Sequence, residues 1–476
     1  MQQKNSQGLK APQENIRVLV SHGLKTVLPG LKSGASTTII KNRRAMKGRL
    51  MKFGCAVILG IAALFSTAAQ TRAQDAPSRV AEAAKLADIL SEAERHNPRI
   101  QAARHAWEAA KEVPSQVSSF PDPQAMLQQF SVGSPRPFAG YTNSDFAYVG
   151  LGFSQDLPYP GKLRLRGEVA KRDAEVSEQK YESVRREILS EVKQSYFQLG
   201  YLAERTRILD SDRVLVRQVE ESAEARYRSG KGNQQEVLQA QLEQTKLARE
   251  ITENELEIDK TEAALKQLLN RSQSTPDIQA EALAERALPY TFDELLAATR
   301  AGNPEIAGMQ KMVERQKLEV DLAKKDFGPD FNLQYTWQRT DPTQYRAYYM
   351  VTFGVRIPLH RGRLHAEVAE AKAGQDRAQS EYDAESQQVA SELRQQFATA
   401  EKSAELLKIY GDGLIPQARA ELQAGFAAYE SNRLDFQALL NSFLDVLKLE
   451  EEYWQTLSEH ETALAQIEEA TGLALR

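Results

Sequence analysis

Histidines and glycine-flanked lysines are the residues of this chain whose types could support metal or phosphate chemistry. His360 and His365 lie five residues apart, but a metal site needs a third ligand in a fixed geometry. Gly161-Lys162 and Gly230-Lys231-Gly232 lack the upstream glycine and the Ser or Thr of a phosphate-binding loop. The many carboxylates show no acid–base pairing that stands out. We therefore predict no catalytic residue, no metal site, no cofactor and no enzymatic activity.

The composition limits the classes of protein to which the chain can belong. Hydrophobic residues make up 41% and charged residues 26% of the 476 residues, and the mean hydropathy is −0.52. These values exclude an inner-membrane transporter built from apolar helices. The single cysteine, Cys55, excludes a disulfide framework and a cysteine-rich zinc site.

The N-terminal region has the pattern of a leader. A basic start at Met51-Lys52, an apolar run over 53–65 and small residues up to Ala73 are typical of a secretory signal peptide. We predict a leader and signal peptide over 1–73. We expect no lipid anchor at Cys55, because a lipoprotein cysteine follows the apolar run. Residues 1–73 hold 12 of the 61 Lys and Arg but one of the 65 Asp and Glu. The rest of the chain is therefore acidic and is not expected to bind nucleic acid through charge.

The elements that would position any functional residue come from an internal repeat. Short motifs recur in the same order about 200 residues apart, which predicts two tandem copies over 88–272 and 291–474 with Pro276 and Pro289 in the linker. The matching motifs are Asn97-Pro98-Arg99-Ile100 with Asn303-Pro304-Glu305-Ile306, Phe120-Pro121-Asp122-Pro123 with Phe327-Gly328-Pro329-Asp330, Gln155-Asp156-Leu157-Pro158 with Val355-Arg356-Ile357-Pro358, Gly161-Lys162-Leu163 with Gly362-Arg363-Leu364, and Tyr227-Arg228-Ser229-Gly230 with Tyr429-Glu430-Ser431-Asn432.

Each copy contains one stretch with the period of β-strands. Residues 331–339 and 345–357 alternate apolar and polar side chains around a turn at Asp341-Pro342, and 147–154 alternate in the first copy with a partner at about 124–132. We predict one hairpin at about 124–157 and one at about 331–357. Aromatic residues gather around these hairpins, as in the girdle of a membrane barrel: Tyr141, Phe146, Tyr148, Trp337, Tyr345, Tyr348 and Tyr349.

A very long helix is expected after each hairpin. Residues 163–229 contain no proline and carry apolar residues three or four apart, and 363–430 repeat this pattern with an interruption at Gly411-Asp412-Gly413 and Pro416. Gly230 and Asn432 follow these helices and tolerate a left-handed backbone, so we predict hinge turns there. Second helices then run back over about 234–270 and 434–470.

Four strands of about 9 to 13 residues are long enough to cross a bilayer when tilted, but four strands cannot close into a barrel. A sheet in lipid has no free edge, so other copies must complete it, and a trimer with about twelve strands is the smallest assembly expected to leave an open pore. Pro158 and Pro358 end the hairpins. The predicted fold is mainly α with a small β part, in which long coiled-coil helices form a tube and four transmembrane strands per chain join a trimeric barrel.

This order of helix, hairpin, Pro-Gly-Lys/Arg step, long helix and Tyr-containing hinge resembles the TolC family of outer-membrane efflux channels over about 85–474. Three stretches are most similar to its heavy-metal branch, typified by CzcC and CusC: Phe120 to Pro123, Gln155 to Lys162, and Tyr429 to Leu440. The resemblance implies a passive exit duct in the outer membrane of a Gram-negative bacterium, with a periplasmic helical extension. It also implies a homotrimer in outer-membrane lipid, a periplasmic adaptor and an inner-membrane RND transporter as partners.

Site residues follow from the same resemblance. The periplasmic mouth of this family lies at the hinges, where inward-pointing carboxylates narrow the entrance. Glu236, nine residues after Tyr227, and Asp435, six residues after Tyr429, are the candidate gate residues, and the unequal spacing leaves their equivalence open. A ring of such acids favours cations; a solvated acid at a helix start is the alternative interpretation. Pro158, Gly161, Pro358 and Gly362 are the expected barrel-to-helix transitions.

Three other functions remain open. One alternative is the same type of channel for organic drugs or a type I secretion substrate, since none of the motifs contacts a cargo. A secreted coiled-coil scaffold without a pore would explain the helices but not the four alternating segments. A periplasmic adaptor has a single helical hairpin, whereas this unit is duplicated.

Overall fold

The computed structural model describes residues 84–130, 147–340, 347–431 and 433–475. The leader over 1–73, Cys55, the hinge residue Asn432 and the aromatic residues Tyr141, Phe146 and Tyr345 lie outside these residues. All of the described residues belong to one compact unit, Ser78–Arg476.

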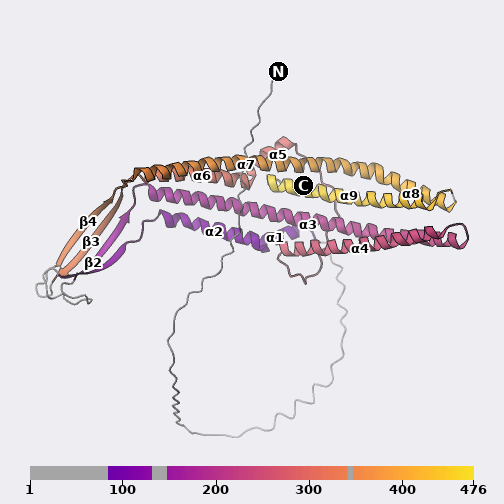
Figure 1. Cartoon of the computed structure of the whole chain (residues 1–476), viewed down its shortest axis with the longest axis horizontal. Helices are drawn as coiled ribbons and strands as arrows, with labels where there is room; N and C mark the ends of the chain where they lie inside the picture. The colour runs from indigo at the N-terminus through magenta and orange to yellow at the C-terminus, as the bar shows by residue number, and fades with distance from the viewer. Residues whose placement is uncertain (1–83, 131–146, 341–346, 432, 476) are drawn as a thin grey trace, which may run out of the picture. The chain divides into compact units, whose positions relative to one another are not determined.

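The same series of elements occurs twice along the described chain (Figure 1). The first series contains α1 (Leu86–His96), α2 (Pro98–Ser118), β1 (Gln124–Phe130), β2 (Tyr148–Leu157), α3 (Lys162–Arg228) and α4 (Gln234–Leu268). The second contains α5 (Phe292–Gly302), α6 (Pro304–Lys325), β3 (Asp330–Thr340), β4 (Ala347–Arg356), α7 (Arg361–Lys408), the π-helix η1 (Ile409–Leu414), α8 (Ile415–Glu430) and α9 (Phe436–Thr471). The prediction of a mainly helical fold with a small sheet is confirmed.

The Asn-Pro motifs begin equivalent helices in the two series. Asn97 caps α2 and Asn303 caps α6, each accepting hydrogen bonds from two backbone N–H groups, and the following proline needs no partner at this position. Each asparagine also donates from Nδ2 to the end of a return helix: Asn97 to the Leu268 carbonyl at 2.8 Å, and Asn303 to the Ala470 carbonyl at 3.2 Å. The motif therefore fixes both a helix start and a helix–helix contact.

The four strands form one antiparallel sheet in the order β1-β2-β3-β4. The two hairpins are joined by β2 and β3, where Asp156 lies opposite Asn332 and Leu157 opposite Phe331. Strands β1 and β4 are the two edges. Leu127 on β1 and Phe353 on β4 belong to a set of apolar side chains that are largely exposed on these strands. Among the described residues of the single chain, the sheet thus has neither neighbours for its edges nor cover for its apolar surface.

The buried core lies among the helices. One cluster joins α3, α4, α8 and α9 near the hinges, a second joins α1, α3, α4 and α9, and a third joins α5, α7 and α9. α3 has 67 residues, which at 1.5 Å per residue makes it about 100 Å long. Figure 1 shows α3, α4, α7 and α9 running side by side, with β2 leading into α3 and β4 into α7.

The interruption expected at Gly411-Asp412-Gly413 is the π-helix η1, a wider turn that does not end the helix. The spacing of the buried residues explains why it is there. Before η1, buried positions of the two long helices match at a separation of 201 residues, as in Val192 and Leu393. After η1 they match at 202, as in Val216 and Ala418. The second series holds one extra residue, and the wider π turn absorbs it while keeping the apolar face toward the core.

Candidate functional site

The first hinge is a tight turn between α3 and α4. Gly230 has a φ of 70°, in the left-handed region where a side chain would be strained. Asn233 caps α4 by accepting a hydrogen bond from the Glu236 backbone N–H at 3.0 Å. The Glu236 side chain is half-buried in the first turn of α4. A carboxylate at this place also lies at the positive end of the helix dipole.

The second hinge, between α8 and α9, uses its acid differently. Asp435 is exposed and caps α9, accepting a hydrogen bond from the Ala438 backbone N–H at 2.7 Å. Since Asn233 and Asp435 both follow a hinge tyrosine by six residues and both cap the return helix, they are the equivalent pair. Ala438 holds the position that Glu236 has in the first series. The question of equivalence left open by the spacing is thus answered: Glu236 has no acidic counterpart at its position.

Tyr429 joins the two hinges. Its side chain is 1% exposed and packs edge to face against Phe436, with ring centroids 6.1 Å apart. The Arg226 guanidinium lies 4.4 Å from the ring centroid of Tyr429, and Arg226 Nη1 donates to the Tyr429 carbonyl at 2.8 Å. The Tyr429 hydroxyl donates to Glu236 Oε2 at 3.3 Å. Burial and the Glu236 charge raise the pKa of Tyr429 to about 12, so the hydroxyl stays a neutral donor.

Sequence reasoning missed the Tyr429 to Glu236 contact. It associated Glu236 with Tyr227, which precedes it in the chain, but Tyr227 is 49% exposed. Arg226 was not singled out at all. The recurrence of tyrosine at both hinges was the available signal, but periodicity does not say which of two equivalent residues is buried against the other half of the chain.

The first junction between strand and helix is held by a buried lysine and two partly exposed carboxylates. Lys162, which is 4% exposed, contacts Asp330 Oδ1 at 2.9 Å and Asp326 Oδ1 at 3.0 Å through Nζ. Asp330 also accepts a hydrogen bond from the Tyr159 backbone N–H at 2.8 Å. Gly161 reaches a φ of 92° directly before α3, so the step from Pro158 into the helix needs a glycine here.

The second junction has the same motif in another environment. Pro358 lies between β4 and α7, and Gly362 is the second residue of α7, with no atom within 4 Å of a side chain built there. Arg363 matches Lys162 in the motif, but its side chain is 63% exposed and pairs with Glu367 on its own helix. His360 precedes α7, and the His365 ring packs edge to face on Phe327 with centroids 5.2 Å apart.

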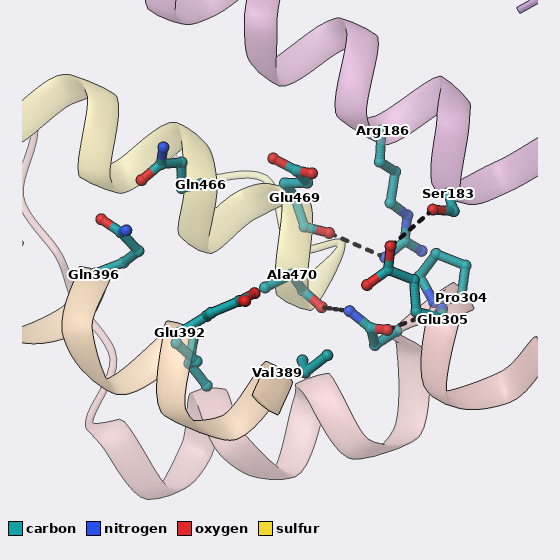
Figure 2. A pocket seen from close by; sticks show the side chains of 12 residues that line it. Ser183, Arg186, Pro304, Glu305, Val389, Glu392, Gln396, Gln466, Glu469 and Ala470 are labelled. Atoms are coloured by element: carbon teal, nitrogen blue, oxygen red, sulfur yellow. Dashed lines mark hydrogen bonds between the residues drawn. The ribbon is translucent and has the colours of Figure 1, made fainter. Parts of the chain in front are cut away.

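A polar cavity of about 300 Å³ lies between α3, α6, α7 and α9 (Figure 2). Ser183 Oγ donates to Glu305 at 3.1 Å, and Arg186 Nη1 donates to the Glu469 carbonyl at 3.4 Å. Burial raises the pKa of the Glu469 carboxyl. Among the described residues, no three His, Cys, Asp or Glu side chains are grouped so that they could hold a metal ion. The cavity therefore offers polar contacts between four helices rather than a built ligand set.

In the part of the chain that the structure describes, no helix has both the length and the apolarity needed to cross a membrane.

Comparison with known proteins places the whole repeat in one family. The outer membrane efflux protein family model matches residues 89–271 and 295–468, one segment in each series. The cobalt-zinc-cadmium resistance protein CzcC of Cupriavidus metallidurans is 23% identical over 323 residues, covering 66% of this chain and 74% of CzcC.

Solved structures show the same fold at low sequence identity. The outer-membrane channel OprN has a TM-score of 0.72 and 18% identity, covering 82% of this chain and 90% of OprN. CusC has a TM-score of 0.72 and 16% identity, covering 82% of this chain and 92% of CusC. VceC of Vibrio cholerae has a TM-score of 0.69 and 18% identity, covering 82% of this chain and 97% of VceC.

The family model covers most of the chain, its two matched segments coincide with the two series of elements, and the fold is that of solved outer-membrane channels. The chain belongs to the outer membrane efflux protein family.

Proposed function

We propose that this chain is the outer-membrane exit channel of a tripartite efflux system, and that heavy-metal cations are its cargo. One observation carries the channel: a four-stranded sheet with two open edges and exposed apolar side chains leads directly into α3 and α7. Such a sheet is stable in lipid only when further copies close it. The proposed assembly is a homotrimer with about twelve strands, docked by a periplasmic adaptor and an RND pump.

The metal cargo is supported by the similarity to CzcC, whose name describes cobalt, zinc and cadmium resistance. The test is growth of a strain lacking this gene on divalent and monovalent heavy-metal ions and on organic drugs, dyes and detergents. Sensitivity confined to metal ions, restored by the full chain, supports the proposal. Sensitivity to organic compounds alone overturns the metal cargo and leaves the channel. A chain that stays a soluble periplasmic monomer overturns the channel.

Glu236 is the proposed gate carboxylate, placed at the periplasmic mouth. It lies at the first hinge and accepts the hydrogen bond that ties Tyr429 to α4. Three copies would put three such carboxylates around the entrance, which favours cations over anions. Asp435, which is exposed, contributes a second acid at the other hinge, where it also caps α9.

Planar-bilayer conductance tests the gate. Glu236→Gln keeps the size of the side chain and removes its charge, so we expect a loss of cation selectivity, and Glu236→Ala additionally loses the hydrogen bond to Tyr429 and should raise conductance. Asp435→Asn removes the charge at the other hinge and keeps the helix cap, since asparagine also caps helices, and it therefore measures the contribution of this second acid separately. Unchanged conductance and selectivity in both Glu236 variants would remove this residue from the gate.

A further inference from the structure

Because the two series are repeats, a contact made by residues of one series predicts a contact for the equivalent residues of the other. Ser154 pairs with Gln124 in the first hairpin and Gly354 pairs with Asn332 in the second. Ser154 and Gly354 are equivalent, because they lie four residues before Pro158 and Pro358. Gln124 is therefore equivalent to Asn332, and Asp122, two residues earlier, is equivalent to Asp330.

Several cation–carboxylate contacts join the first series to the second, among them one at the junction and one between α3 and α6. Lys162 contacts Asp330 at the junction, and Lys311 Nζ on α6 contacts Glu175 Oε2 on α3 at 3.4 Å. For both contacts, the equivalent residues of the repeat are not paired with each other among the described residues. Arg363 on α7 takes the place of Lys162 and the exposed Asp122 that of Asp330. Asp376 on α7 takes the place of Glu175, and His105 on α2 that of Lys311.

A surface depression on the first series is equivalent to the cavity of Figure 2 but has one wall fewer. The cavity of Figure 2 has walls from α6, α7, α9 and, at Ser183 and Arg186, from α3. The equivalent depression has walls from α2, α3 and α4. Its fourth wall would be the counterpart of the α3 segment, which is the part of α7 around Ala384 and Gln387. The lining of this depression includes no residue of α7.

We propose that α7 and β4 of a second copy of this chain dock on β1 and α2, with Arg363 of one copy paired to Asp122 of the next and Asp376 paired to His105. In this seam β4 continues the sheet beside β1 in the register that β2 has with β3, so that Arg356 lies opposite Gln124 and Phe353 opposite Leu127. The proposal rests on the homotrimer proposed above and adds its residue-level partners. Charge complementarity and the transferred register select a second copy as the occupant.

Paired cysteines test the register. The full chain carries Cys55→Ser, and Leu127→Cys is combined with Phe353→Cys. We expect oxidised trimers linked between subunits in most of the protein. The matched control combines Leu127→Cys with Val355→Cys, which lies two residues along β4 on the same face and should link at least tenfold less. Preferential linking in the control overturns the register.

Charge reversal tests the ion pair at the junction. Arg363→Asp and Asp122→Arg should each lower the fraction of heat-resistant trimers in outer-membrane fractions at least tenfold, because two like charges then meet. The double variant should restore it to within twofold of the original chain. Restoration also shows that the single variants still fold. Trimers unaffected by either single reversal, or not restored in the double variant, overturn the pair.

The outcomes separate this inference from the proposed function. A chain that is monomeric in the outer membrane overturns both. Trimers that support metal resistance but form no link between Leu127→Cys and Phe353→Cys overturn only the seam.

Discussion

The two junctions between strand and helix have nearly the same sequence motif but different environments. At the first, Lys162 is buried between Asp326 and Asp330, because β3 lies beside β2 in the same chain. At the second, Arg363 is exposed and forms an ion pair with Glu367 of its own helix, because β4 is a sheet edge. The motif therefore buries its cation only where a neighbouring hairpin provides the acids. Within one chain this is the case at the first junction.

The two hinges show the same asymmetry. Tyr429 is buried against Arg226 and Glu236 of the first hinge, whereas Tyr227 is half exposed. Both tyrosines occupy the same place in their repeat. Lys162 and Tyr429 thus have their partners within the chain. Their equivalents, Arg363 and Tyr227, are exposed. Variants made at matched positions test whether the two residues of each pair differ in their contribution to stability.

The largest effect is expected at the buried hinge tyrosine. Tyr429→Ala removes a ring from a closely packed cluster and leaves Glu236 without its hydroxyl donor, so we expect a loss of about 3–5 kcal/mol in the free energy of unfolding. Tyr227→Ala should cost less than about 1 kcal/mol. Thermal unfolding of the detergent-purified chain measures both. Equal losses at the two hinges would break the comparison.

The junction lysine comes next. Lys162→Met leaves Asp326 and Asp330 close together without their cation, at an expected cost of about 2–3 kcal/mol in the unfolding free energy. Arg363→Met is the matched change, and because Arg363 is exposed within its own chain, it should leave unfolding of the monomer nearly unchanged. Its effect should appear only in the yield of trimers. A loss of monomer stability in Arg363→Met contradicts the asymmetry.

Two glycines of the same motif should respond with opposite signs. Gly161→Ala forces a side chain into a φ of 92° and should destabilise by about 1–2 kcal/mol. Gly362→Ala lies in a helix with open space around it and should stabilise slightly. The shift in unfolding midpoint gives each sign, and two shifts of the same sign would contradict the difference between the junctions.

The pH-dependent effect concerns a half-buried acid of α3. Burial, with Glu450 and Glu250 nearby, raises the pKa of Asp212 to about 7, and at a separation of 202 residues its counterpart is Leu414, the last residue of η1. Since the folded pKa lies above the ordinary value of 3.8, charging Asp212 destabilises the fold as pH rises from about 4 to 7. Asp212→Asn should therefore raise the unfolding temperature at pH 8 and leave it unchanged near pH 4. A benefit that is equal at both pH values points to a cause other than titration.

Much of the secondary structure was predictable because its signals are local. Alternation over 331–339 specified β3, the Asn-Pro motifs marked the starts of α2 and α6, and the absence of proline allowed the length of α3. The interruption at Gly411 to Gly413 was expected from composition. Its π-helical form was not, because it reflects one extra residue relative to the other series.

The candidate sites were only partly predictable. The hinge glycine and the junction glycine followed from residue type, and both have a positive φ. Glu236 and Asp435 were both candidate gate acids with their equivalence left open, and the spacing did not reveal that Asp435 is a helix cap equivalent to Asn233. Sequence spacing gives the distance along the chain, and it does not give the side chain that arrives from another helix.

Local sequence signals were enough to locate the helices and strands, since caps, turns and periodicity act over a few neighbouring residues. The recurrence of motifs in the sequence also showed that these elements occur twice. The tertiary structure decided which of the repeated residues became partners. Lys162 meets Asp330 across 168 residues and Tyr429 meets Glu236 across 193. Such contacts depend on how helices and hairpins pack side by side, and equivalent motifs therefore acquired different roles.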